Sequence, residues 1–104
     1  MDAALRAIAE PHRREIVRLV WSNELAAGAI ADRFREVSRP AISQHLRVLR
    51  DAGLLSERRD GTRRLYRARR ERIDQLRAYL DGFWSDRLVA LKTAAEREAK
   101  RKRS

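Results

Sequence analysis

The chain has 104 residues and no cysteine, which fits one small domain and excludes disulfides, thiolate metal sites and a cysteine nucleophile. Its formal net charge of +10 favours a polyanionic partner. The sequence has no apolar run long enough to cross a bilayer and no signal-peptide pattern in its first residues. We therefore expect a cytoplasmic protein with no membrane partner.

Two helices are predicted in the first quarter of the chain. Residues 2–9 form a short helix, and Pro11 begins a second helix that ends near Asn23. Apolar residues three or four positions apart give each helix an inward stripe: Leu5 and Ile8 in the first, and Ile16, Leu19 and Val20 in the second. The basic cluster at residues 12–14 lies in the first turn of the second helix, where it is either solvated or recruits a phosphate.

A third helix is predicted at residues 26–35, with Ile30 and Phe34 on one face. Three residues then lead into a further helix that begins after Ser38. Two short helices joined by three or four residues form the layout of a helix-turn-helix, whose second helix reads DNA. An ordinary helical hairpin is the alternative.

The helix at residues 38–52 has one apolar and one polar face. Ser38 is a candidate N-cap, Pro40 suits the first turn, and Gly53 supplies a left-handed stop. The inward face carries Ile42, Leu46 and Leu49. The candidate DNA-binding residues of this helix are Ser38, Arg39, Pro40, Ser43, Gln44 and Arg47.

A β-hairpin is predicted at residues 55–67, because Asp60-Gly61 separates two runs of strand-forming residues. Residues 58–104 hold sixteen basic and seven acidic residues, whereas residues 1–57 are nearly neutral. Charge on an exposed hairpin can serve only to prevent edge pairing, but so many arginines near one turn favour a DNA-contacting wing. The candidate wing residues are Arg58, Arg59, Arg63, Arg64 and Tyr66.

A long helix is predicted from about residue 71, with an apolar stripe of roughly heptad spacing. Such a stripe on so small a domain favours an interface with a second copy of the chain. Residues 1–95 would form the DNA-binding and dimerisation domain, and residues 96–104 a basic, disordered tail. The predicted dimer residues are Leu5, Ile8, Leu76, Leu80, Phe83, Trp84, Leu88 and Leu91.

The fold class predicted by these elements is mainly α with a small β-hairpin. The order of the elements resembles the ArsR/SmtB family of winged helix-turn-helix transcriptional regulators, over about residues 2–92. Three segments carry the resemblance: EPHRREIVRL at 10–19, SRPAISQHLRVLRDAGL at 38–54 and ERRDGTRRLY at 57–66. The resemblance implies a homodimeric bacterial repressor, bound to the nucleoid, in which the first and last helices form the dimer interface.

The family's metal sensors use thiolates near the third helix or His and carboxylate sets on the terminal helix. This chain has no cysteine, and its two histidines, His12 and His45, lie outside the terminal helix. We therefore expect no cofactor and no metal sensing by these routes, and the segment at 83–88 resembles a metal-independent branch whose effector is unknown. For His45 we expect a partly exposed flanking role.

The leading functional hypothesis is a sequence-specific DNA-binding regulator, a homodimeric repressor with a palindromic operator. The alternative is a nonspecific architectural protein that binds double-stranded DNA through the wing and the basic tail. We expect no enzyme, because Ser43 and His45 are two positions apart on one helix and face different directions.

Overall fold

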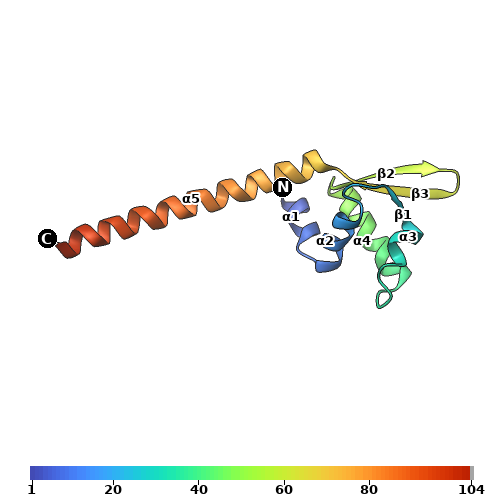
Figure 1. The fold of residues 1–104 in the computed structure, drawn as a ribbon, viewed down its shortest axis with the longest axis horizontal. Coiled ribbons are helices and arrows are strands. Elements are labelled where there is room, and N and C mark those ends of the chain that lie inside the picture. The colour runs from blue at the N-terminus through green and yellow to red at the C-terminus, as the bar shows by residue number, and fades with distance from the viewer. Residues whose placement is uncertain (104) are drawn as a thin grey trace. The chain divides into compact units, whose positions relative to one another are not determined.

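The computed structural model describes residues 1–103, apart from the side chains of Trp84, Asp86 and Arg103. It divides into two compact units, Met1–Asp74 and Gln75–Ser104. Within the first unit, the helices α1, α2 and α4 lie together, and the β2–β3 hairpin projects away from them (Figure 1). The elements in chain order are α1 (Asp2–Ile8), α2 (Pro11–Leu19), β1 (Leu25–Ala26), α3 (Ala27–Ala31), α4 (Arg39–Asp51), β2 (Leu55–Asp60), β3 (Arg63–Ala68) and α5 (Arg70–Arg103).

The core of the first unit is made by the inward faces of α2, α3 and α4. The predicted stripe of α4 is confirmed, since all three of its apolar residues are buried. In α2 the stripe is confirmed at Ile16 and Val20, whereas Leu19 is only half-buried. In α1 the buried residues are Ala4 and Ala7. The fully buried side chains include Ile16, Val20, Ile30, Ile42, Leu46 and Leu49.

Both ends of α4 are fixed by the residues that the sequence indicated. The Ala41 amide donates a hydrogen bond of 3.2 Å to Ser38 Oγ, so Ser38 is the N-cap. At the other end Gly53 has a φ of +80°, and the amides of Gly53 and Leu54 donate to the carbonyls of Arg50 and Leu49 at 2.9 and 3.0 Å. This is the Schellman motif, which turns the chain sharply out of the helix and into β2.

A three-stranded antiparallel sheet in the order β1-β3-β2 packs beside these helices. The strand β1 was not predicted from the sequence, and its two residues pair with Tyr66 and Leu65 of β3. The helix α3 is shorter than predicted, because residues 32–37 form turns that bury Phe34 outside the helix. A strand of two residues has no measurable periodicity, and β1 exists because β3 offers it an edge.

The hairpin is confirmed, but its turn lies one residue later than predicted. Asp60 pairs with Arg63, so the two-residue loop is Gly61-Thr62. Gly61 has a φ of +63°, as the first central residue of a type II′ turn requires. The shift changes every cross-strand pair, and it places Glu57 opposite Tyr66.

The helix α5 continues to Arg103, through residues 96–103 for which we predicted disorder. Two acidic residues precede a run of basic residues there, and Arg101 pairs with Glu98 at 2.8 Å across one turn. In the second unit Leu76 is buried and Leu80 is half-buried, whereas other large apolar side chains are 50–66% exposed. The exposed apolar residues of α5 are Tyr79, Phe83, Leu88, Val89 and Leu91.

No helix within residues 1–103 combines the length and the apolar character needed to span a membrane.

Candidate nucleic-acid interface

The outer face of α4 carries every side chain proposed to contact DNA from this helix. Ser38, Arg39, Pro40, Ser43, Gln44 and Arg47 are all exposed. Arg39 Nη2 donates to Asp32 Oδ1 at 3.0 Å, but both side chains are about 70% exposed. An ion pair so open to water contributes little to the stability of the fold, and it leaves the guanidinium available to another partner.

The wing arginines differ in how strongly they are already paired. Arg58 donates two hydrogen bonds to Glu24, at 2.6 and 3.1 Å, and these lower the pKa of that carboxyl. Arg63 donates to Asp60 at 3.2 Å, on the exposed tip of the hairpin. Within the part of the chain that the structure describes, Arg59 has no ion pair. Arg58 therefore ties the wing to the segment before β1, whereas Arg59 remains available to a ligand.

Arg59 and Arg64 are direct cross-strand partners on one face of the hairpin. Like charges in this position repel and destabilise the sheet. Glu57 lies two residues before Arg59 on the same face, and Arg64 Nε is 3.8 Å from its Oε1. One carboxylate is thus near two arginines, so this face of the wing keeps a net positive charge that an anionic ligand would neutralise.

Glu57 also connects the wing to α4. Its Oε2 accepts hydrogen bonds from Arg50 Nη1 at 2.8 Å and from the Tyr66 hydroxyl at 3.3 Å. The hydrogen bond from Arg50 holds the pKa of Glu57 below its ordinary value. Burial and the nearby Glu57 carboxylate raise the pKa of Tyr66. Tyr66 is only 5% exposed, so the structure gives it a supporting role in place of the predicted contact with DNA.

A cleft of about 390 Å³ lies between α4 and the wing. Arginines from both elements line it, together with the Ser43 hydroxyl, which can donate a hydrogen bond. The shape and charge of this cleft suit a phosphate group or a chain of them. Its lining residues include Ser43, Arg47, Arg50, Arg64 and Tyr66.

Comparisons with known proteins decide the family. A family model described as a helix-turn-helix domain matches residues 8–58. The chain is 44% identical over 88 residues to the HTH-type transcriptional regulator Rv2034 of Mycobacterium tuberculosis, covering 85% of this chain and 81% of that protein. It is 30% identical over 81 residues to the arsenical resistance operon repressor of Staphylococcus xylosus, covering 78% and 77%. The chain belongs to the ArsR family of helix-turn-helix transcriptional regulators.

A solved structure agrees with this assignment. The crystal structure of a possible transcriptional regulator for arsenical resistance matches with a TM-score of 0.72 and 47% identity, over 86% of this chain and 95% of that one. The mainly helical, winged helix-turn-helix fold predicted from the sequence is confirmed. Because the relatives are transcriptional regulators, the expectation that this ArsR-family protein is no enzyme is also confirmed.

The residues predicted to form the dimer interface of this regulator are largely available. Leu5 and Ile8 of α1 are half-buried, and three predicted residues of α5 are among its exposed apolar side chains. The three exposed residues of α5 are Phe83, Leu88 and Leu91. The side chain of Trp84, which was also predicted at the interface, lies outside the described residues.

The members of the basic cluster at residues 12–14 make hydrogen bonds within the protein, although Arg14 is also exposed to solvent. Arg13 donates from Nε to the Ala7 carbonyl at 2.6 Å and from Nη2 to the Arg6 carbonyl at 3.1 Å. Arg14 donates to the Ile8 carbonyl at 2.8 Å. These bonds satisfy carbonyls at the end of α1 and fix the corner between α1 and α2.

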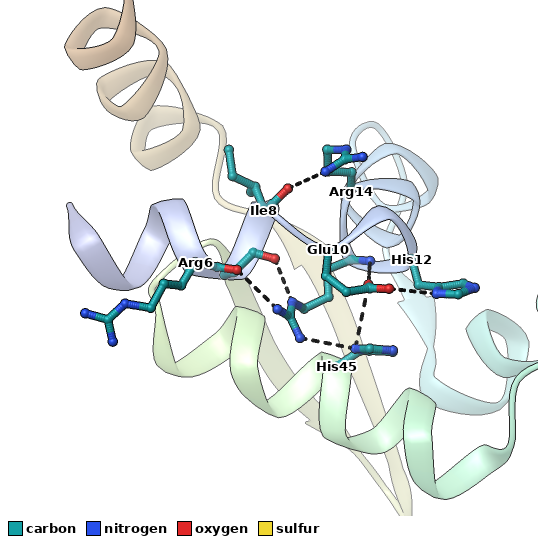
Figure 2. Close-up of polar contacts among 8 residues, drawn as sticks. Arg6, Ile8, Glu10, His12, Arg14 and His45 are labelled. Carbon is teal, nitrogen blue, oxygen red and sulfur yellow. Dashed lines mark hydrogen bonds and ion pairs between the residues drawn. The ribbon is translucent and has the colours of Figure 1, made fainter. Parts of the chain in front are cut away.

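The structure also brings His12 and His45 together around Glu10, an arrangement that the sequence analysis missed (Figure 2). Glu10 is the N-cap of α2 and accepts from the Arg13 amide at 2.9 Å. Its carboxylate contacts His12 Nδ1 at 2.8 Å and lies 3.9 Å from His45 Nδ1. The two imidazole rings stack with centroids 5.8 Å apart. Burial lowers the pKa of His45, whose side chain is 16% exposed.

Proposed function

We propose that this regulator is a homodimeric, cytoplasmic repressor that binds a palindromic operator on the bacterial nucleoid through α4 and the wing. The observation that carries the proposal is the division of α4 into two faces. One face is buried in the core, and the other is lined with exposed donors beside an arginine-lined cleft. A helix anchored in this way can enter the major groove without loss of its packing.

Base reading falls to Arg39, Ser43, Gln44 and Arg47. Arginine pairs with the O6 and N7 of guanine, and glutamine pairs with the N6 and N7 of adenine. Ser38 and Pro40 lie at the N-terminus of α4, which we place against a backbone phosphate because helix N-termini attract anions. Four side chains that contact base edges from one helix are enough to specify a short half-site.

The wing supplies contacts that are independent of sequence. We assign the phosphate or minor-groove contacts to Arg59, Arg63 and Arg64, whose charges are exposed. Arg58 is held by Glu24, and Tyr66 by Glu57, so both position the wing.

The proposed dimer places two copies of α4 on one operator. Half-buried residues of α1 and exposed apolar residues of α5 would be covered by the second copy. A two-fold dimer would set its two recognition helices about 34 Å apart, in successive major grooves. The operator would then be a palindrome with one helical turn between half-site centres. The interface would comprise Leu5, Ile8, Leu80, Phe83, Trp84, Leu88 and Leu91, whereas Leu76, which was also predicted there, is already buried within the single chain.

Selection of DNA from a random pool by the purified full-length protein tests the proposal. The expected result is a palindromic site bound by two chains, with an affinity at least about a thousandfold above that for a scrambled duplex at the same salt. A ratio near one would instead support a nonspecific architectural protein. A reporter whose promoter overlaps the selected site then tests repression, since expression should fall when the regulator is supplied.

A further inference from the structure

The cluster of Glu10, His12 and His45 has the composition of a metal site. One carboxylate oxygen and two imidazole nitrogens lie within 4.8 Å of one another, and all three residues are half-buried. Glu10 is the N-cap of α2, His12 lies in the first turn of that helix, and His45 comes from the middle of α4 (Figure 2). We propose that these three residues bind one divalent transition metal ion, best matched by Zn²⁺, with a fourth position open to water.

The donor set and its spacing both suit zinc. Two imidazoles and one carboxylate form a known three-ligand set for Zn²⁺, with bonds of about 2.0–2.2 Å. In a tetrahedral site such bonds place the donor atoms about 3.4 Å apart. The observed separations are 2.8 Å from Glu10 Oε1 to His12 Nδ1 and 3.9 Å from Glu10 Oε2 to His45 Nδ1, and one ligand atom from each of the three residues lies within 4.8 Å of the others. Small rotations of the two imidazoles would therefore complete the site.

The three ligands are already held in place by other contacts. The Glu10 carboxylate is fixed by the Arg13 amide at the start of α2. The His12 ring packs edge-on against Phe34, with centroids 5.8 Å apart, and His45 lies on a well-packed helix. Ligands oriented in advance lose less conformational entropy when the metal binds. To bind metal through Nδ1, neutral His12 would adopt the tautomer that carries its single proton on Nε2, and its half-exposed ring would keep this Nε2–H hydrated.

Arg13 opposes the metal and limits its affinity. Its Nη1 lies 3.4 Å from His45 Nδ1, so a metal would replace this long hydrogen bond and meet a nearby positive charge. The guanidinium is anchored to the carbonyls of Ala7 and Arg6, away from the Glu10 carboxylate. Arg13 can thus stay in place while His45 turns to the metal.

This site differs in position from the routes considered in the sequence analysis, which used thiolates or the terminal helix. A metal bound here would join the start of α2 to α4, because His12 and His45 are 33 positions apart in the chain. Because the unfolded chain does not hold these ligands together, binding would stabilise the folded state. The proposal does not depend on DNA binding.

The test is a titration of untagged, chelator-treated full-length protein with Co²⁺ and then with Zn²⁺. The chain has two histidines and no cysteine, so an intense tetrahedral Co²⁺ spectrum with imidazole ligation can arise only from His12 and His45. We expect that spectrum, its displacement by Zn²⁺, and a rise in the melting temperature with Zn²⁺.

Matched variants make the test specific. Glu10→Gln removes a ligand but keeps an acceptor for the Arg13 amide, and His12→Gln removes a half-exposed ligand, so both variants should fold. Each should weaken Co²⁺ binding more than about tenfold. Glu15→Gln, an exposed position on the same helix, should leave it unchanged. A weak octahedral spectrum, or equal affinities in Glu10→Gln, His12→Gln and Glu15→Gln, would overturn the proposal.

Discussion

Arg50 Nη1 donates a hydrogen bond of 2.8 Å to Glu57 Oε2, and this bond joins α4 to the first strand of the wing. Tyr66 donates to the same oxygen from the second strand. Glu57 of β2 is therefore bonded to α4 and to β3, through two residues, Arg50 and Tyr66, that line the cleft. Its carboxylate fixes the position of the wing relative to α4, and with it the spacing between the two parts of the proposed DNA interface.

Glu57→Gln should raise the nonspecific affinity for DNA and lower the specificity of binding. The variant weakens the bond to Arg50 and removes a negative charge beside the cleft. Nonspecific affinity at low salt should rise, whereas the ratio of specific to nonspecific affinity should fall. Stability should drop by about 1–3 kcal/mol, because the hydrogen bond from Arg50 no longer joins two charged groups. Fluorescence anisotropy on the two duplexes and urea unfolding measure these effects, with Glu36→Gln in an exposed turn as the control.

The same carboxylate should give the protein a measurable sensitivity to acid. The pKa of Glu57 is lowered in the folded state from its ordinary value of 4.5. Its contribution to stability is therefore complete above pH 4.5 and is lost as the pH falls through the lower, folded-state pKa. The free energy of unfolding of the wild type and of Glu57→Gln, measured from pH 6 downward, should converge in acid. A difference that stays constant down to the acid limit would contradict the assignment.

Arg39→Ala should relax the preference for one base in each half-site. The side chain is exposed at the first turn of α4, and its pair with Asp32 is open to water. We expect a loss of about 1–3 kcal/mol in discrimination at that base, with little change in the stability of the protein. Repeating the selection of DNA with the variant measures this directly. An unchanged operator would show that Arg39 reads no base.

Structure that is encoded by neighbouring residues was predicted correctly from the sequence. The cap at Ser38, the stop at Gly53 and the buried stripe of α4 each depend on residues within one or two turns of the helix. The hairpin was also predicted, because a glycine turn between strand-forming runs is a local signal.

Structure that depends on residues far apart in the chain was not predicted from the sequence. Placing the turn at Asp60-Gly61 would have paired Glu57 with Arg64, and the observed register pairs it with Tyr66. The bond between Glu57 and Arg50 depends on how the wing packs on α4, which no periodicity reports. The meeting of the two histidines likewise follows from the packing of α2 on α4.

Leu91→Lys should convert the proposed dimer into a monomer. Leu91 is 66% exposed, so the substitution should not disturb the fold of a single chain. In the dimer it would place a charge in an apolar interface without a partner. Sedimentation velocity measures the mass, and circular dichroism verifies the helix content. Thr93→Lys, also exposed on α5, is the control, and a dimer that survives Leu91→Lys would remove this residue from the interface.

Arg58→Ala and Arg59→Ala should differ, although the two residues are adjacent on β2. Arg59 lies opposite Arg64 on the face that we assign to DNA, whereas Arg58 is held by Glu24. Arg59→Ala should weaken binding to all duplexes alike and reduce the slope of log affinity against log salt by about one. Arg58→Ala should leave that slope nearly unchanged, because the arginine it removes is already neutralised by Glu24. Titrations at several salt concentrations give both slopes, and equal slopes for the two variants would show that the hairpin does not present one face to DNA.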